Sequence, residues 1–484
     1  MKARCSILWI RLDLRLEDNP ALQAAVKHGG AIIPVFIHAP EEEAPWQPGG
    51  ASCWWLHQSL GALETGLRKV GSRLVLRRGP SHTALRELIV ETGASAVFWN
   101  RRYEPAVIAR DAGIKKALAA ADVEAKSFNG ALLHEPWTIQ NQSQKPFQVF
   151  TPFWKHCLTL STPAEPLPAP ERICAPAKWP KSLALEALDL EPKINWAEGI
   201  KSAWQPGVEG ARTQLKRFLL DAFLNYSEAR NRPDLPGTSR LSPHLHFGEI
   251  TPRQIWRAVR RHAESRDIPE SIWRSSQFLT EIGWREFAHH LIYHFPRTPE
   301  EPLRADFNKF SWRHDPVHLK AWQNGHTGYP IVDAGMRELW TTGWMHNRVR
   351  MIVASFLVKD LLLSWEEGAR WFWDTLVDAD LAQNTLGWQW TAGCGADAAP
   401  YFRVFNPVSQ GEKFDPQGDY VRRWCPELAA LPDEWLHKPW EASAEVLKRA
   451  SVLLGRNYPQ PIVNHAAARE AALSAFAKIR KAKG

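Results

Sequence analysis

The sequence predicts two domains of different class: an α/β domain with a parallel, doubly wound sheet, followed by an all-α domain. Residues 1–130 alternate between short Val- and Ile-rich runs and helical segments, the order of a parallel sheet with crossover helices. From about Val208 the apolar residues recur with helical spacing nearly to the end, without convincing strands. With 484 residues, the chain is also too long for one ordinary core.

Four buried strands are expected in the first domain. Each is apolar and bounded by turn residues, and they span residues 6–10, 31–38, 73–79 and 95–100. Helical segments follow them at residues 21–28, 52–70, 81–93 and 105–121. Ser81 is the expected N-cap of the third helix, and Pro105 is the expected first residue of the fourth. No GxGxxG motif follows the first strand, so a standard dinucleotide site is not indicated there.

A connector separates the two domains. Residues 161–182 carry six prolines and little periodicity. Five segments of the second half have helix-spaced apolar residues, at 213–226, 276–295, 336–344, 345–363 and 366–376. We assign residues 1–130 to the α/β domain, 131–205 to the connector, 206–475 to the helical domain and 476–484 to a short basic tail.

The composition narrows the function only broadly. A net charge of +8 suits a polyanionic partner, although many basic proteins never bind nucleic acid. The 25 tryptophans against 7 tyrosines indicate base stacking or electron transfer beside the ordinary role of Trp in a core. The six cysteines form no CxxC pair, which favours a reducing compartment. Without a signal peptide or a run of about 18 apolar residues, the expected location is the cytoplasm.

Four long motifs in the second half are far more specific, at residues 237–256, 281–292, 328–362 and 378–407. In order and spacing they closely resemble the FAD-binding domain of photolyases and cryptochromes. Residues 9–22 are similar to that superfamily's N-terminal motif. The chain is thus identified as a member of the superfamily over essentially its whole length, in the branch near plant cryptochromes (class III-like).

The resemblance implies a carbon–carbon lyase, a deoxyribodipyrimidine photo-lyase that repairs UV-damaged DNA. In such flavoproteins, reduced FAD absorbs blue or near-UV light and lends an electron to a cyclobutane pyrimidine dimer, while the protein supplies positioning and electrostatics. A cryptochrome, which is a blue-light signalling receptor, is the nearest alternative, favoured by residues 49–60, 374–381 and 386–389. A light-independent helical protein that stacks nucleic-acid bases on Trp is a third. We expect a monomer that does not bind membranes.

The resemblance also implies which residues hold FAD. Thr238, Ser239 and Ser242 lie where a loop enters a helix, a place suited to a pyrophosphate, although such hydroxyls alone are more often helix caps. Asn384 matches the residue that faces flavin N5, where plant cryptochromes carry Asp. The full expected set is Tyr226, Thr238, Ser239, Arg240, Leu241, Ser242, Phe278, Arg350, Asp378, Ala379, Asp380 and Asn384. For Arg350, an internal salt bridge to Asp378 is equally open.

A lesion pocket is expected from three separate segments. Glu281 and Trp284 are three residues apart, so a carboxylate and an indole share one helix face, which is also an ordinary core pattern. The resemblance assigns Glu281, Trp284, Asn347, Met351 and Trp390 to a dimer flipped out of the duplex. Glu281 would hydrogen-bond the dimer's carbonyls and stabilise its added charge. Photolyases for 6-4 photoproducts carry histidines around residues 347–351, so that substrate is disfavoured.

Three tryptophans, Trp312, Trp365 and Trp388, match the superfamily's electron relay from the surface to the flavin. Any one of them alone is more often a core residue. Trp371 and Trp373 resemble the plant-cryptochrome branch, and a second path through them is left open.

Contacts to DNA are expected from Arg230, Arg285, Arg348, Arg403 and Gln410, with Arg350 and Lys413 as further cations beside the motifs. A solvated surface is the ordinary alternative for such charges. His290 and His294 have a metal-like spacing, but no Glu lies between them and no third ligand is evident. A packed or capping role is therefore expected, and no metal site.

An antenna chromophore is expected in the first domain. Residues 104–109 read EPAVIA and depart from the Asn-Glu pair of the best-known folate-type photolyases. The plant-cryptochrome-like features around residues 41–51 favour methenyltetrahydrofolate bound differently, with a deazaflavin second.

Overall fold

The computed structural model describes residues 4–398 and 403–481, which form two compact units. The first unit comprises the chain up to Leu220 together with Ser239–Pro296 and Val377–Asp380. The second comprises Asp221–Thr238, Arg297–Leu376 and the chain from Leu381 onward. The helical half of the sequence therefore contributes to both units.

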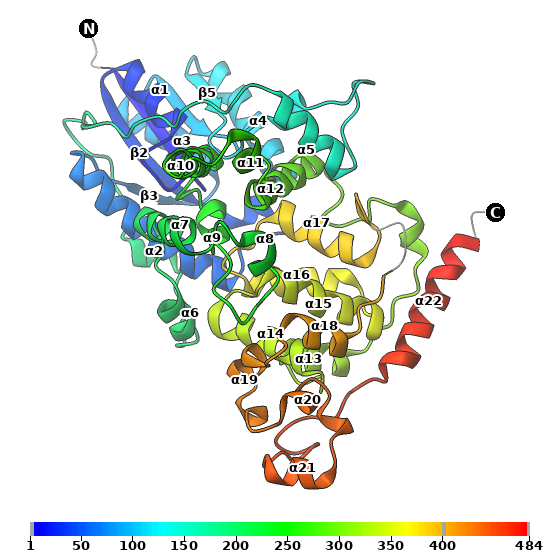
Figure 1. The fold of residues 1–484 in the computed structure, drawn as a ribbon. Helices are drawn as coiled ribbons and strands as arrows, with labels where there is room; N and C mark the ends of the chain where they lie inside the picture. Colours follow the sequence, from blue (N-terminus) through cyan, green and yellow to red (C-terminus); the bar gives the residue numbers. More distant parts are fainter. Residues whose placement is uncertain (1–3, 399–402, 482–484) are drawn as a thin grey trace. The chain divides into compact units, whose positions relative to one another are not determined.

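The first unit contains a five-stranded parallel sheet of order β3-β2-β1-β4-β5, which is drawn in blue to cyan in Figure 1. Its strands are β1 (Cys5–Ile10), β2 (Ala31–His38), β3 (Val75–Arg78), β4 (Ala96–Asn100) and β5 (Glu124–Phe128). β1 is buried along its whole length because both faces of a doubly wound sheet are covered. The predicted fold class and four of the strands are confirmed. β5 was missed, because its sequence EAKSF is polar and only partly buried at the sheet edge.

The helices of the first unit are α1 (Pro20–His28), α2 (Gly50–Lys69), α3 (Ser81–Thr92), α4 (Pro105–Ala120), α5 (Phe150–Thr159), α6 (Glu198–Ala203), α7 (Val208–Asp221), α9 (Ser242–His246), α10 (Pro252–Glu264), α11 (Glu270–Arg274) and α12 (Gln277–His294). α1, α3 and α4 pack against strands of the sheet. Short turns of 3-10 helix are η1 (Pro40–Glu43), η2 (Pro136–Thr138) and η3 (Leu185–Leu188).

Two local predictions for the first unit have different outcomes. Pro105 is the first residue of α4, as expected. Ser81 is not the N-cap of α3 but its first helical residue, and its N–H and hydroxyl both donate to the Glu42 carboxylate. The hydroxyl is therefore committed to a partner far away in the sequence, which a local capping pattern cannot reveal.

The described residues of the second unit form helices joined by loops, and apart from two isolated bridges they contain no strand. Its helices are α8 (Tyr226–Ala229), α13 (Pro316–Gln323), α14 (Pro330–Thr342), α15 (Asn347–Ser355), α16 (Trp365–Thr375), α17 (Leu381–Ala392), α18 (Pro407–Phe414), α19 (Asp419–Trp424), α20 (Asp433–Leu436), α21 (Ala444–Arg449) and α22 (His465–Lys481). η4 (Ala305–Lys309), η6 (Pro426–Leu428) and η7 (Pro439–Glu441) are 3-10 turns, and η5 (Phe356–Asp360) is a π-helical turn that continues α15.

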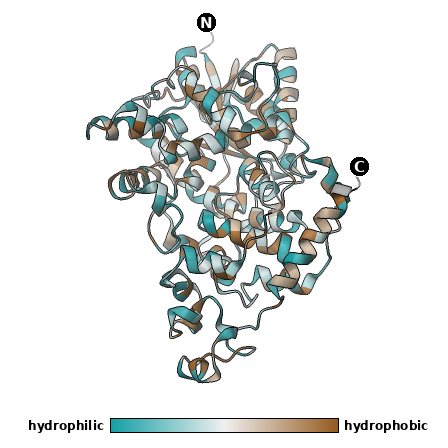
Figure 2. Ribbon diagram, turned by 45° about the vertical axis from the view of Figure 1, so that its right-hand side comes forward, coloured by the Kyte–Doolittle hydropathy of each residue, from teal (hydrophilic) through white to brown (hydrophobic). Residues whose placement is uncertain are grey.

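Hydrophilic and hydrophobic residues are interspersed along the helices of both units (Figure 2). None of the helices in the described residues combines the length and the hydrophobicity that a membrane span requires.

Candidate flavin, lesion and DNA sites

The loop before α9 has the features expected of a phosphate-binding segment. Arg240 has a left-handed backbone (φ 52°), and the N–H of Leu241 donates to the Ser239 hydroxyl at 3.4 Å. The N-cap of α9 is Leu241, without a side-chain capping bond. Neither Thr238 nor Ser239 is therefore a simple helix cap. Hydroxyls and a cation gathered in one turn suit an anionic ligand.

Asp380 is held between two histidines within the first unit. Its Oδ2 lies 3.9 Å from His246 Nδ1 and 3.5 Å from His289 Nε2. Burial alone would raise the pKa of Asp380. These histidines and Arg285 outweigh that effect and hold the pKa of Asp380 well below its usual range. The carboxylate therefore stays charged, an acceptor suited to ribose hydroxyls or a ring N–H. Asp378 and Ala379 precede it, both buried.

α12 presents the expected carboxylate and indole. Glu281 Oε1 accepts a hydrogen bond from Gln277 Nε2 at 2.7 Å, which orients the carboxylate. The Trp284 ring stacks on Phe150 of α5, with centroids 3.7 Å apart and planes 9° from parallel. Trp284 is only half-buried, so Phe150 backs an indole that remains partly accessible. Gly283 makes this close packing possible, since a Cβ there would lie 2.5 Å from Trp154 of α5.

The next two residues of α12 hold the loop at residues 131–134. Glu286 accepts hydrogen bonds from the N–H groups of Leu133 and His134 at 2.9 and 3.2 Å. Burial raises the pKa of Glu286 to about 7, against the lowering effects of Arg285 and these N–H groups. Arg285 donates to the Ala131 carbonyl at 2.8 Å, so its guanidinium holds the same loop. A DNA contact for Arg285 stays a prediction.

The paired histidines of α12, His290 and His294, contact the backbone around Pro136. His290 Nδ1 and His294 Nε2 both lie against the Pro136 carbonyl, at 3.2 and 3.1 Å. His290 Nε2 accepts from the Phe147 N–H at 3.0 Å. No group of three or more metal-binding side chains occurs among the described residues.

In the second unit, Asn347 and Met351 of α15 lie one turn apart, and α15 packs against α17, which carries Trp390. Asn347 is exposed, while Met351 and Trp390 are half-buried, so all three are accessible. Glu281 and Trp284 belong to the first unit, so the convergence of all five residues on one cavity stays a prediction.

The three tryptophans of the expected relay all lie in the second unit, and the first of them is the most exposed. Trp312 is half-buried, whereas Trp365 and Trp388 are each 2% exposed. The Arg313 N–H donates to the Leu362 carbonyl at 2.8 Å, and Arg313 forms an isolated bridge with Leu363. The chain next to Trp312 therefore lies beside the chain just before Trp365.

Trp388 is seated on α16 through Gly368, one turn beyond Trp365. A Cβ on Gly368 would lie 2.0 Å from Cη2 of Trp388, so the indole contacts the bare backbone. Trp365 and Gly368 share a helix face, and Trp388 therefore packs on the face that carries Trp365. Elsewhere, Trp371 stacks on Trp340 with centroids 6.0 Å apart, and Trp340 is 61% exposed.

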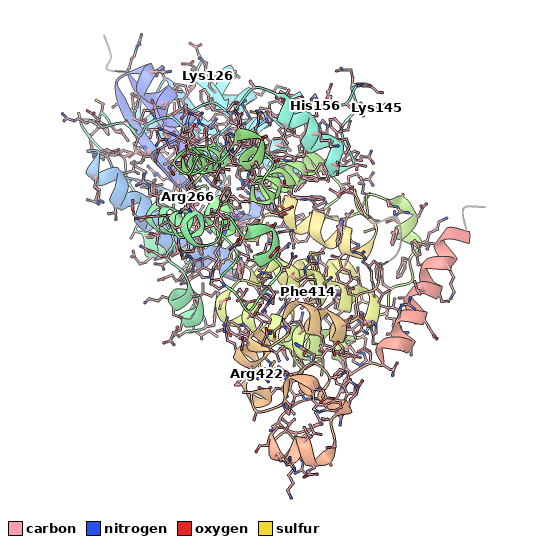
Figure 3. The ribbon with its side chains drawn as sticks, in the orientation of Figure 1. Lys126, Lys145, His156, Arg266, Phe414 and Arg422 are labelled. Atoms are coloured by element: carbon pink, nitrogen blue, oxygen red, sulfur yellow. The ribbon has the colours of Figure 1, made fainter. Side chains whose placement is uncertain are left out.

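Three arginines of the second unit form a cationic cluster. The Arg348 guanidinium lies 4.5 Å over the Phe414 ring and donates to Asn231 Oδ1 at 2.5 Å (Phe414 is labelled in Figure 3). Burial, Arg230 and Arg403 together lower the pKa of Arg348. Arg403 is exposed, and Gln410 of α18 is half-buried. Because these cations repel one another, a polyanion would stabilise the cluster.

The remaining expected cofactor residues are distributed over both units. Tyr226 opens α8 and lies under the Arg230 guanidinium at 5.8 Å. Phe278 packs on Phe218, with centroids 4.4 Å apart. Arg350 donates to the Met345 carbonyl at 2.7 Å. Asn384 donates from Nδ2 to the Ala369 carbonyl at 3.0 Å, which leaves its amide oxygen as the atom to face a ligand.

Sequence reasoning missed three residues that complete these arrangements. Phe150 lies in the connector, 134 positions before Trp284, and no periodic pattern marks it. Gln277 precedes Glu281 by one helical turn, a spacing that could have identified it. Gly368 follows Trp365 by three residues, and a glycine inside an amphipathic helix is itself a signal of close packing.

The chemistry of these side chains fits FAD. Hydroxyls and Arg240 in one turn suit the pyrophosphate, the Asp380 carboxylate suits hydroxyl or N–H donors, and the Asn384 amide oxygen suits the N–H of a reduced flavin ring.

Comparisons with known proteins agree with this chemistry. A family model described as DNA photolyase matches residues 6–171, and one described as the FAD-binding domain of DNA photolyase matches residues 278–478. The chain is 51% identical to the deoxyribodipyrimidine photo-lyase of Agrobacterium fabrum, over 99% of both chains. It is 42% identical to cryptochrome-2 of Arabidopsis thaliana, over 99% of this chain and 79% of that protein.

Two solved structures are similar along the chain. The class III photolyase of Agrobacterium tumefaciens matches with a TM-score of 0.95 and 51% identity, over 99% of this chain and 98% of that one. The Synechocystis cryptochrome matches with a TM-score of 0.90 and 32% identity, over 98% and 100%. The chain therefore belongs to the photolyase and cryptochrome family, and it has an FAD-binding domain of the photolyase type.

Proposed function

We propose that this protein is a light-driven DNA photolyase that splits cyclobutane pyrimidine dimers in UV-damaged DNA. The observation that carries the proposal is the face of α12, where the half-buried Trp284 is backed by Phe150 one turn from the oriented Glu281. The full-length similarity to a deoxyribodipyrimidine photo-lyase supports the same conclusion.

The lesion residues have separate roles. Trp284 offers a flat apolar wall to the flipped dimer, and Phe150 keeps that wall from rotating. Glu281, held by Gln277, would donate a hydrogen bond from a protonated carboxyl to a pyrimidine carbonyl, which favours the form of the dimer that carries extra negative charge. Asn347, Met351 and Trp390 are proposed as further residues that contact the dimer.

The cofactor would be held by Tyr226, Phe278, Arg350, the segment 238–242, residues 378–380 and Asn384. When bound, FAD supplies the light-excited electron that splits the dimer. Trp388, Trp365 and Trp312 would carry electrons inward from the surface to keep the cofactor reduced. A second route through Trp371 and Trp373 stays open, and the stacking of Trp371 on the exposed Trp340 supports it.

DNA would be held by Arg230, Arg348, Arg403 and Gln410, with Arg285 as a further candidate. The mutual repulsion of the arginines around Arg348 supports a phosphate-binding surface. We further infer that the protein acts as a cytoplasmic monomer.

We also propose an antenna chromophore in the first unit, methenyltetrahydrofolate first and a deazaflavin second. Ligands of doubly wound sheets bind where the strand order reverses, here between β1 and β4. In this chain Arg11 fills that place, because it is buried and donates to Asp111 at 2.7 Å and to the Asn100 carbonyl. This supports a site elsewhere, near residues 41–51. Mass spectrometry of the extracted cofactors tests which antenna chromophore is bound.

A cryptochrome signalling role is the second candidate, favoured by the similarity to cryptochrome-2 of Arabidopsis thaliana. Asn384, in place of the Asp of plant cryptochromes, favours the photolyase. To separate the two, the purified protein is incubated with UV-irradiated DNA in blue light and in darkness, and the dimers are counted. A photolyase removes dimers only in the light. Unchanged dimer counts in a sample with bound, reduced flavin would favour the cryptochrome.

A further inference from the structure

Trp204, at the end of the connector, lies directly beneath the loop that is proposed to hold the FAD phosphates. The Arg240 guanidinium lies 4.1 Å over the Trp204 ring, the shortest of the cation–ring contacts described in this chain. Trp204 is 6% exposed, so this contact is largely removed from water. Cation–π attraction is stronger at such a desolvated site than at an exposed one.

Trp204 is itself held rigidly. Its ring meets Trp55 edge-on, with centroids 5.4 Å apart and planes at 68°. Trp55 stacks on Phe247 and donates from Nε1 to the Glu249 carboxylate at 3.0 Å. The same carboxylate binds the Ser59 hydroxyl and His244 Nδ1, and Glu249 is 1% exposed. The indole beneath Arg240 is thus fixed by a buried polar network.

Arg240 needs such a support because its backbone is in the left-handed region, with φ 52°. A residue with a side chain pays a conformational cost there, and it persists only where the surroundings over-determine it. The cation–π contact fixes the direction of the side chain, and the Ser239 hydroxyl bonded to the Leu241 N–H fixes the turn.

We propose that Trp204 is a positioning residue for the cofactor: it aims the Arg240 guanidinium at the pyrophosphate of FAD. This inference rests on the proposed function, in which the segment 238–242 holds those phosphates. The connector is then part of the flavin site, and Trp204 acts on FAD only through Arg240.

The test is a double-mutant cycle on FAD affinity, measured by titrating the full-length apoprotein with FAD. A buried cation–π contact of about 1–2 kcal/mol corresponds to a change in Kd of about 5- to 30-fold. We expect Trp204→Leu to weaken FAD binding by that factor, and Trp204→Phe, which keeps an aromatic face, to weaken it less. Added to Arg240→Met, Trp204→Leu should have almost no further effect.

Trp256→Leu is the matched control, because Trp256 is also buried in the first unit with Arg274 over its ring at 5.9 Å. It should leave FAD affinity unchanged. Independent, additive effects of the Trp204 and Arg240 substitutions, or equal losses for Trp204→Phe and Trp204→Leu, would overturn the proposal. A wild-type chain that binds no FAD would instead refute the proposed function itself.

Discussion

The buried Glu286 makes a specific prediction about stability against pH. Its pKa rises from 4.5 to about 7, first because of burial. Below about pH 4.5 the carboxyl is protonated in both the folded and the unfolded chain, so the shift has no effect. Above that pH, Glu286 ionises first in the unfolded chain. The free energy of unfolding then falls until Glu286 has ionised in the folded chain too. A difference of about 2.5 pKa units corresponds to a loss of about 3 kcal/mol above pH 7.

Glu286→Gln removes this penalty while keeping an acceptor for the N–H groups of Leu133 and His134. At each pH we compare the free energy of unfolding of the variant with that of the wild type. We expect this difference to favour the variant more at pH 8 than at pH 5, by up to about 3 kcal/mol. Urea unfolding followed by circular dichroism at both pH values measures this. Glu87→Gln on the exposed face of α3 is the control and should show no such difference. An equal effect of Glu286→Gln at both pH values would refute the reasoning.

Three further predictions concern electron transfer and DNA. Trp388→Phe should slow the photoreduction of bound FAD severely while FAD binding persists. Photoreduction at the normal rate would show that Trp312, Trp365 and Trp388 are not the electron relay. Gly368→Ala should also slow it, because the new Cβ would displace the Trp388 ring, whereas Gly387→Ala, with nothing within 4 Å, should not. Arg403→Ala should weaken binding to damaged and undamaged DNA alike and flatten the salt dependence by about one unit of slope; a loss confined to damaged DNA would mean that Arg403 contacts the lesion.

Sequence patterns predicted the elements whose signal is local. The apolar strands β1, β2, β3 and β4 and the amphipathic helices were found because each segment carries its own periodicity. β5 was missed because an edge strand with a polar sequence has no such signal. Ser81 was misjudged because Glu42, its actual partner, is brought near only by the fold.

The same division applies to the site. Glu281 and Trp284 were predicted to share a face, and one helix does carry both. Phe150, which backs Trp284, was not predicted, since a contact across 134 residues depends on how α5 packs against α12. Arg240 was predicted from the resemblance, but its support by Trp204 depends on the tertiary packing of the connector.

Repair and lesion binding by variants of α12 test most directly whether this helix presents a dimer-binding face. Trp284→Ala should lose about 1–3 kcal/mol of dimer binding, the range for a base–aromatic stack, with a much smaller effect on undamaged duplex. Glu281→Ala should chiefly lower the number of dimers repaired per absorbed photon, because its hydrogen bonds matter most to the charged form of the dimer. Both variants should keep FAD, since neither residue is proposed to hold it. If both lost FAD, or both repaired dimers normally, these residues would belong to the core and the account of α12 would be contradicted.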